Sequence, residues 1–128
     1  MVSSERITYM NGDFIPESEA KVHFRDRSFK YGDGVFDMTR TFGHKIFKIE
    51  EHVERLYKSL NYLDIKLDLP PKKMVEISKE VLQRNLPLIK KDEDYWVGQR
   101  ISRGVDRVGG EQWDLEGGPT VIVECAPL

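Results

Sequence analysis

The sequence has very little cysteine and no long apolar run. Cys125 is the single cysteine among 128 residues. A lone cysteine excludes an internal disulfide and a cysteine-rich metal site, and it favours a reducing compartment, so we expect a cytoplasmic protein. No apolar run is long enough to span a bilayer, and the first six residues lack the apolar segment of a secretory signal. We therefore expect no membrane partner.

An excess of charge of one sign is also lacking. The chain has 20 Lys and Arg against 22 Asp and Glu, which gives a net charge of −2. Because nucleic acids attract strongly basic surfaces, this balance argues against a nucleic-acid partner. The hydrophobic fraction of 39% and the charged fraction of 33% are typical of one globular domain of this length.

Clear metal-binding and nucleophile motifs are lacking too. His23, His44 and His52 stand alone, without acidic or cysteine partners at metal-ligand spacing. His52 follows two glutamates at an expected helix start, where we expect it to be solvated or to cap the helix. No serine lies in the context of a nucleophile elbow. Cys125 ends an apolar strand pattern, and we expect it to be a buried small hydrophobe.

The patterns that are present predict strands, then two helices, then strands. The helices follow apolar residues at helical spacing, and the strands follow alternating or β-rich runs. This order predicts an α+β domain with an antiparallel sheet and two main helices. The predicted strands are 7–10, 14–15, 21–24, 35–42, 45–49, 94–103 and 119–126, and the predicted helices are 50–63 and 71–85.

The stretch KYGDGVFDMTRTF, residues 30–42, places two glycines around Asp33. Loops that cradle phosphate usually lead into a helix, whose first amides face the ligand. This loop leads into a β-rich run instead. We therefore expect a tight turn in which Gly32 or Gly34 adopts a positive φ angle.

Arg55 lies beside the apolar stripe of the first predicted helix and close to its start. One interpretation pairs it with Glu51, one turn earlier, on the solvent side. The other holds the guanidinium at the edge of the core, where its two-pronged donor geometry suits an anion such as phosphate. The spacing alone leaves both interpretations open.

The run YWVGQRISRG, residues 95–104, shows strand alternation. It places Trp96, Gly98, Arg100 and Ser102 on one face. An arginine among large side chains can line an anion pocket or face the solvent. Gly98 can leave room for a ligand or allow close packing.

Taken in order, four segments resemble a known family. The segments YMNGDFIP, KVHFRDRSFKYGDGVFDMTRTF, IFKIEEHVERLYKSLNYLDI and YWVGQRISRG are similar to the N-terminal domain of the fold-type IV (class IV) pyridoxal-phosphate aminotransferases. This family includes branched-chain aminotransferases, D-amino-acid aminotransferases, (R)-selective amine transaminases and aminodeoxychorismate lyase. The D-amino-acid and (R)-amine branches are most similar over DRSFKYGDGVF and ISRG. The resemblance covers nearly the whole chain.

The resemblance implies a fold, a cofactor and an assembly. Family subunits have two domains, with pyridoxal 5'-phosphate between them, and they usually form homodimers. The arginine of the motif E-H-x-x-R-L binds the cofactor phosphate, which implies this role for Arg55. The tyrosine before the first glycine and the aromatic residue after the second line the substrate pocket, which implies that role for Tyr31 and Phe36.

Departures from the family pattern affect the expected substrate. Branched-chain enzymes place an arginine where this chain has Gly98, and D-amino-acid enzymes place a tyrosine where it has Phe36. D-amino-acid enzymes also carry an arginine and a histidine in the loop after R-G. Here Arg107 is displaced and no histidine follows, so neither carboxylate trap is complete. We expect Trp96 and Arg100 to shape the substrate side, with Arg100 as a relocated carboxylate trap.

The resemblance also implies what lies outside the chain. The family's Schiff-base lysine belongs to a C-terminal domain, so we expect it beyond Leu128 and expect residues 1–128 to be the small domain of a longer polypeptide. Lys30 and Lys45 do not match the lysine motif, and no catalytic residue is expected within this chain.

The expected activity is transfer of an amino group between an amino acid or (R)-amine and a 2-oxo acid. Substrate preference stays open among D-amino-acid, (R)-amine and branched-chain types. Two alternatives also stay open. One is a lyase of the same family that eliminates pyruvate from an aminodeoxychorismate-like substrate. The other is a stand-alone domain with a non-catalytic binding role.

Overall fold

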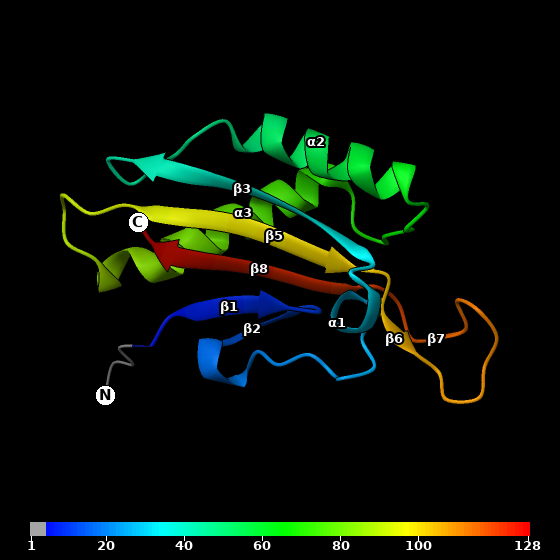
Figure 1. The fold of residues 1–128 in the computed structure, drawn as a ribbon. Coiled ribbons are helices and arrows are strands. Elements are labelled where there is room, and N and C mark those ends of the chain that lie inside the picture. The colour runs from blue at the N-terminus through cyan, green and yellow to red at the C-terminus, as the bar shows by residue number, and fades with distance from the viewer. Residues whose placement is uncertain (1–4) are drawn as a thin grey trace.

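A computed structural model describes residues 5–128. It contains a six-stranded antiparallel sheet in the order β2-β1-β8-β5-β3-β4 and a small two-stranded ribbon of β6 and β7. The two long helices, α2 and α3, pack on the same side of the sheet (Figure 1). The elements are β1 (Ile7–Met10), β2 (Asp13–Pro16), η1 (Glu17–Glu19), α1 (Arg27–Tyr31), β3 (Gly34–Phe42), β4 (Lys45–Ile46), α2 (Ile49–Tyr62), α3 (Pro71–Asn85), η2 (Leu86–Leu88), β5 (Tyr95–Ser102), β6 (Val105–Asp106), β7 (Leu115–Glu116) and β8 (Thr120–Pro127).

This architecture confirms the predicted α+β class, the antiparallel sheet and the two main helices. The strand predicted at 21–24 is wrong. All four of its side chains are exposed, and the segment joins no strand ladder, so its alternation serves no buried face. Helix α1 was not predicted. Asp26 caps it by accepting a hydrogen bond from the backbone N–H of Ser28. Among residues 5–128, no helix combines the length and the apolar character needed to cross a membrane.

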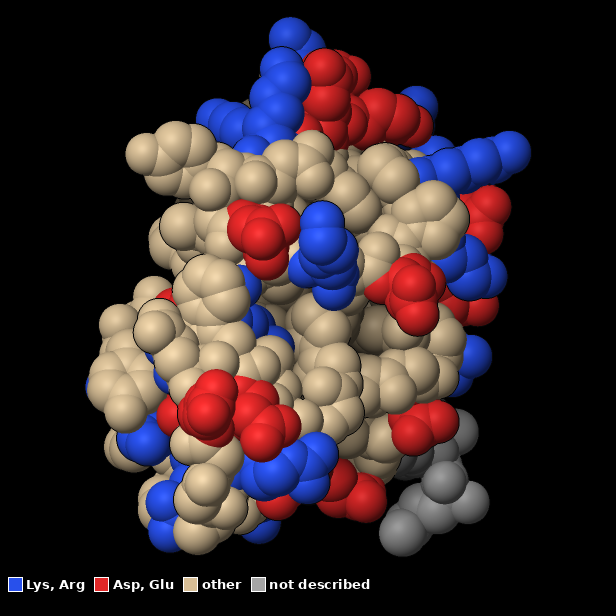
Figure 2. All heavy atoms as spheres, turned by 90° about the vertical axis from the view of Figure 1, so that its right-hand side faces the viewer, with Lys and Arg blue, Asp and Glu red and all other residues tan. Residues whose placement is uncertain are grey.

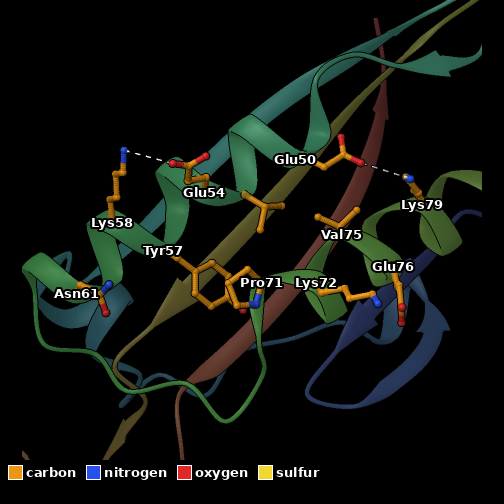
Figure 3. A pocket seen from close by; sticks show the side chains of 11 residues that line it. Glu50, Glu54, Tyr57, Lys58, Asn61, Pro71, Lys72, Val75, Glu76 and Lys79 are labelled. Atoms are coloured by element: carbon orange, nitrogen blue, oxygen red, sulfur yellow. Dashed lines mark ion pairs between the residues drawn. The ribbon is translucent and has the colours of Figure 1, made fainter.

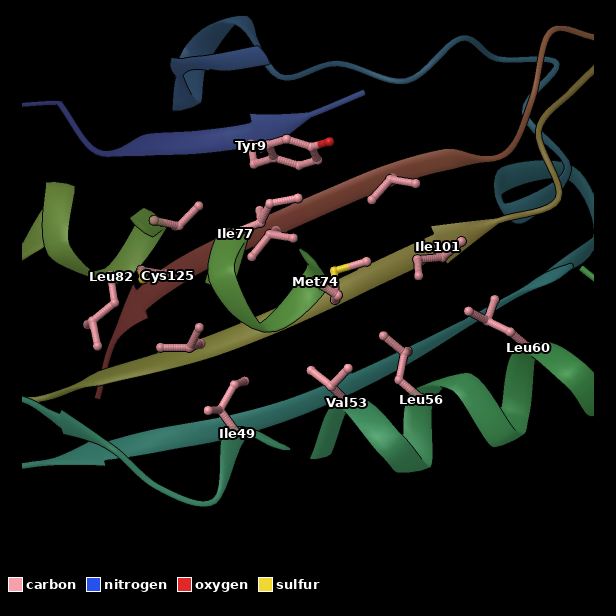
Figure 4. Packing of buried hydrophobic residues seen from close by; sticks show 14 of the residues in the cluster. Tyr9, Ile49, Val53, Leu56, Leu60, Met74, Ile77, Leu82, Ile101 and Cys125 are labelled. Carbon is pink, nitrogen blue, oxygen red and sulfur yellow. The ribbon is translucent and has the colours of Figure 1, made fainter. Parts of the chain in front are cut away.

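The hydrophobic core lies between the sheet and the two long helices (Figure 4). Alternate residues of β5 and β8 point into it, as strand geometry requires. Cys125 is 1% exposed, and burial raises the pKa of its thiol to about 12, which confirms the expectation of a buried small hydrophobe. The core side chains include Val53, Leu56 and Leu60 of α2, Met74, Ile77 and Val81 of α3, Tyr95, Val97 and Ile101 of β5, and Val121 and Val123 of β8.

The opposite face of the sheet is left uncovered by α2 and α3 (Figure 1). On this face Phe36 of β3 pairs with Arg100 of β5, which pairs in turn with Ile122 of β8. Phe36 is 66% exposed and Trp96 is 39% exposed. The predicted alternation of β5 is therefore confirmed, and we call this surface the open face.

Candidate functional site

A buried carboxylate joins the middle of β3 to the first turns of α2. Asp37 is 6% exposed and faces the helix side of the sheet. Its two oxygens accept hydrogen bonds from Arg55 Nε at 2.7 Å and Arg55 Nη2 at 3.0 Å. The Nδ1 atom of His52 lies 2.6 Å from Oδ1 of the same carboxylate. His52 and Arg55 are three residues apart, so α2 presents them on one face. We call these three residues the Asp37 cluster.

The cluster keeps Asp37 ionised. Burial opposes the charged form, but hydrogen bonds from Arg55 and His52 outweigh it, and the pKa of Asp37 lies below its usual range. The hydrogen bond to Asp37 likewise raises the pKa of Arg55. Because an ionised carboxylate only accepts hydrogen bonds, Nδ1 of His52 must carry the proton in this contact.

The cluster excludes the Glu51 pair that one interpretation of Arg55 predicted. The guanidinium pairs with Asp37 rather than with Glu51. Its side chain is nevertheless 68% exposed, so Asp37 holds it from the protein side while the other side faces outward. The expectation for His52 was wrong, because its ring is only 22% exposed and contacts Asp37 instead of solvating or capping the helix start.

Asp37 and His52 were missed as site residues, although the sequence holds a signal for both. Asp37 follows Phe36 directly, so strand alternation places it on the face toward the helices. His52 precedes Arg55 by three residues, which places both on one side of the helix. The sequence does not show that Asp37 of β3 lies beside His52 and Arg55 of α2 in the folded protein.

The glycine-rich segment combines a helix end with a strand start. Gly32 has a φ angle of 68° and ends α1 in the left-handed conformation, which confirms the predicted turn. Gly34 is needed for a different reason. A Cβ atom there would lie 2.7 Å from the carbonyl oxygen of Ile101, since β3 and β5 approach closely at this point. The segment is thus a turn that enters a strand, as expected.

Asp33, between these glycines, ties the turn to two other segments. It accepts hydrogen bonds from Arg27 Nε at 2.7 Å and Arg103 Nε at 2.8 Å. Arg103 also donates to the carbonyl oxygens of Leu63 and Asp64, just after α2. Burial opposes the ionised form of Asp33, but the two arginines prevail, and its pKa lies below its usual range. The turn is therefore held at several points.

Tyr31 and Arg107 lie at the edge of this held turn. Tyr31 is 60% exposed, with the Arg27 guanidinium 4.7 Å from its ring centroid. Both Tyr31 and Arg107 line a pocket of about 470 Å³ between α1 and the β6–β7 hairpin. Arg107 Nε donates to Asp114 Oδ1 at 3.1 Å. Figure 2 shows this end of the molecule, where acidic and basic side chains are scattered among uncharged residues.

The open face brings Phe36 and Arg100 together. The Arg100 guanidinium lies 5.4 Å from the centroid of the Phe36 ring, and its Nε donates to Glu124 Oε2 at 2.6 Å. Phe36 and Arg100 both line a pocket of about 390 Å³ that also reaches Ser28 and Thr120. This pocket contains an aromatic surface, a cation and hydroxyl groups, so it suits a small molecule with an apolar part and an anionic part.

Trp96 and Gly98 lie further along the same face of β5. Trp96 pairs with Arg40 of β3, away from the Phe36 pocket. A Cβ atom on Gly98 would lie 2.9 Å from Met38 Cε, so the space beside this glycine is filled by Met38. Gly98 therefore allows close packing against Met38, which was one of its two interpretations, and does not leave open space for a ligand.

The groove between α2 and α3, about 660 Å³, lies on the helix layer (Figure 3). Val53, Tyr57 and Val75 line it, and Glu50 forms an ion pair with Lys79 at 3.6 Å across it. The hydroxyl of Tyr57 donates to the carbonyl oxygen of Leu69, and burial raises the pKa of Tyr57 to about 12. The groove holds none of the expected site residues, and four of the charged residues that line it form the ion pairs Glu50–Lys79 and Glu54–Lys58.

The chain matches known aminotransferases in sequence. The family model described as Amino-transferase class IV matches residues 34–96. The chain is 34% identical over 77 residues to "D-alanine aminotransferase" of Staphylococcus aureus (strain N315), covering 60% of this chain and 27% of that protein. It is 32% identical over 120 residues to "Putative branched-chain-amino-acid aminotransferase" of Methanocaldococcus jannaschii, covering 94% of this chain and 40% of that protein.

Solved structures of aminotransferases share the fold. The branched-chain aminotransferase from Thermoproteus uzoniensis with norvaline superposes with a TM-score of 0.80 at 21% identity, covering 97% of this chain and 41% of that chain. The PLP-bound form of a hypothetical aminotransferase from Mycobacterium tuberculosis superposes with a TM-score of 0.75 at 23% identity, covering 94% of this chain and 39% of that chain.

The chain thus spans between 27% and 41% of the length of these relatives. The motifs, the family model and the fold agree over that span. The resemblance to class IV aminotransferases seen in the sequence is confirmed: their family model matches residues 34–96, and the chain has the fold of their N-terminal domain.

Proposed function

We propose that this chain forms the small domain of a pyridoxal-phosphate-dependent aminotransferase, which moves an amino group between an amino acid or (R)-amine and a 2-oxo acid. The observation that carries this proposal is Arg55. It occupies the arginine position of the E-H-x-x-R-L motif, and its exposed guanidinium is held on one side by a buried carboxylate. A fixed cation at a surface is suited to anchor an anionic group that arrives from outside the domain.

The residues present fit the cofactor phosphate. Arginine stays charged at every relevant pH and donates two parallel hydrogen bonds to phosphate. The pair with Asp37 uses Nε and Nη2 of Arg55, and among residues 5–128 Nη1 has no partner. Pyridoxal phosphate, when bound, supplies an electron sink for charge at the substrate α-carbon. Arg55 would hold the phosphate and fix the distance between the cofactor and β3.

In this proposal, the substrate binds on the open face and at its α1 end. Phe36 would pack against the substrate side chain, and Trp96 would extend this apolar surface. Arg100 would bind a substrate carboxylate, for which it must share or release Glu124. Tyr31 and Arg107 would form the rim at the α1 end. Gly98, which has no side chain, would leave the space over β5 to Met38.

The reactive lysine belongs to our proposal of a second domain, located beyond Leu128. The lengths of the relatives support it, since this chain spans at most 41% of them. A homodimer and a cytoplasmic location complete the proposal. The proposed substrate class stays among D-amino acids, branched-chain amino acids and (R)-amines. The first two are supported by relatives named as D-alanine and putative branched-chain aminotransferases, at 34% and 32% identity.

A spectrum and a donor screen test this function. The polypeptide encoded by the complete reading frame is purified with pyridoxal phosphate, and its visible absorbance is recorded before and after borohydride. We expect a visible band that borohydride removes while fixing the cofactor to a lysine. Amino transfer from D-amino acids, L-amino acids and (R)-amines to 2-oxo acids is then measured. Absence of both the band and transfer would contradict the proposal, and pyruvate release without an amino acceptor would indicate a lyase.

A further inference from the structure

Two arginine–carboxylate pairs in this protein have the same geometry but different surroundings. Arg55 meets Asp37 through Nε and Nη2, at 2.7 and 3.0 Å. Arg6 meets Glu17 through the same two atoms, at 3.2 and 2.7 Å. The carboxylate side chain is 38% exposed in Glu17 but only 5% exposed in Asp37. A buried carboxylate beneath an exposed arginine is the unusual arrangement, because burial disfavours its charge.

Asp37 holds the Arg55 guanidinium at two points. Two parallel N–H···O bonds fix the plane of a guanidinium, whereas a single bond lets it rotate. His52 contacts Oδ1 of the same carboxylate at 2.6 Å, and the backbone N–H of Met38 donates to that oxygen at 2.9 Å. The carboxylate is therefore fixed from the helix and from its own strand. An exposed arginine would otherwise lose side-chain freedom when it binds a ligand.

We propose that Asp37 is the positioning residue of the phosphate-binding arginine, with His52 fixing the carboxylate that does so. Asp37 orders Arg55 before any anion arrives and directs the unused edge of the guanidinium outward. The inference rests on the proposed function, in which Arg55 binds the cofactor phosphate. It adds a role for two residues that do not touch the phosphate themselves.

Removing the charge of Asp37 tests the proposal, because the two possible roles of this charge change phosphate affinity in opposite directions. A carboxylate next to Arg55 repels an incoming phosphate, so removing its charge raises phosphate affinity if neutralisation is all it does. If Asp37 orders Arg55, removing its charge weakens the two-point hold and lowers phosphate affinity. The variant Asp37→Asn keeps the size of the side chain and separates these outcomes.

The experiment follows the Nε–H signals of the arginines by ¹⁵N NMR, with inorganic phosphate as the probe at constant ionic strength. In the unmodified protein we expect slow exchange of the Arg55 Nε–H and a phosphate-dependent shift. In Asp37→Asn we expect fast exchange and a loss of phosphate affinity of about tenfold, as hydrogen bonds to charged groups imply. His52→Gln should show a smaller loss in the same direction.

The matched control is Glu17→Gln. It breaks the pair of the same geometry at Arg6 and should leave the Arg55 signal and phosphate affinity unchanged. Equal or tighter phosphate binding by Asp37→Asn would overturn the inference, as would an unmodified Arg55 that does not respond to phosphate. Should Asp37→Asn fail to fold, His52→Gln alone decides, and unchanged exchange at Arg55 would overturn the inference.

This test and the test of function fail separately. If Asp37→Asn loses phosphate affinity but the complete protein transfers no amino group, the proposed function is wrong and the positioning role stands. If the complete protein is active but Asp37→Asn binds phosphate as well as the unmodified protein, the proposed function stands and the positioning role of Asp37 is wrong.

Discussion

The two faces of the central sheet differ in how far their large apolar side chains are exposed. On the helix side, Tyr95, Val97 and Ile101 of β5 are at most 2% exposed and form the core. On the open face, Phe36 and Trp96 are 66% and 39% exposed. Large apolar groups left exposed beside a cation are typical of binding surfaces. Strand alternation thus gives each central strand one side in the core and one side on the open face, which is the proposed substrate surface.

The division is sharpest within β3. Phe36 lies on the open face and its neighbour Asp37 on the helix side, where it holds Arg55. In the proposed enzyme, one strand therefore contributes to the substrate side through Phe36 and to the cofactor side through Asp37. The difference between the faces can be tested by substitutions, taken here from the largest expected effect to the smallest.

The largest contrast is between Leu56→Ala and Phe36→Ala. Leu56 is 1% exposed in the core, and truncation of a buried leucine destabilises a protein by about 2–5 kcal/mol. Phe36 is 66% exposed, so we expect its truncation to change the free energy of unfolding by about 0.5 kcal/mol or less. Urea unfolding measures both. Equal losses of unfolding free energy in the two variants would mean that the open face is covered in the folded protein. This result would contradict the difference between the two faces.

Acid should destabilise the protein through carboxylates held by hydrogen bonds. Asp26 is fully buried and accepts from Ser28 Oγ and Thr120 Oγ1, each at 2.6 Å. Burial opposes its charge, but these hydrogen bonds prevail and lower its pKa. A lowered folded-state pKa adds stability that is full above the ordinary value, about 3.9, and is lost as the pH falls through the folded value.

The variant Asp26→Asn tests this expectation. We expect it to lower the free energy of unfolding at pH 7 by about 1–3 kcal/mol, because buried donors lose their charged acceptor. The loss of stability between about pH 4 and pH 2 should also become shallower than in the unmodified protein. Unfolding followed by circular dichroism across this range measures both effects. An unchanged acid profile would show that Asp26 does not contribute to it.

The smallest effect on stability is expected on the open face, at the Arg100–Glu124 pair. Arg100 is 49% exposed, and exposed ion pairs contribute about 0–1 kcal/mol, so Glu124→Gln should barely change unfolding. In the proposed complete enzyme the same change should lower the KM for carboxylate substrates, since Arg100 loses a competing partner. Arg100→Ala should raise that KM. Unchanged Michaelis constants in Arg100→Ala would remove Arg100 from the substrate site.

Much of the fold could be predicted because local patterns and tertiary packing agree. The apolar stripe of α2, with Val53, Leu56 and Leu60, is the stripe that the core buries. The alternation of β5 gives its two faces, and Gly32 has the positive φ angle expected of the predicted turn. The segment 21–24 alternates without a partner strand, and a single sequence cannot show whether a partner exists.

The site was less predictable, since it depends on which elements meet. The family motif located Arg55, but it did not show that Asp37, 18 residues earlier, would be its partner. His52 was misjudged for the same reason. Its neighbours in sequence are glutamates, whereas its hydrogen-bond partner comes from β3. Contacts between segments set the charge and the orientation of these groups, and local patterns do not include them.

The central claim is that Arg55, held by Asp37, anchors the phosphate of pyridoxal phosphate. The direct measurement is the dissociation constant of pyridoxal phosphate for the complete apo-protein and for Arg55→Ala and Arg6→Ala. Both arginines have the same bidentate pairing, which makes Arg6 the matched control. We predict a loss of about tenfold or more for Arg55→Ala, as expected when a charged hydrogen bond is removed, and no change for Arg6→Ala. Equal affinities in all three proteins would contradict the account.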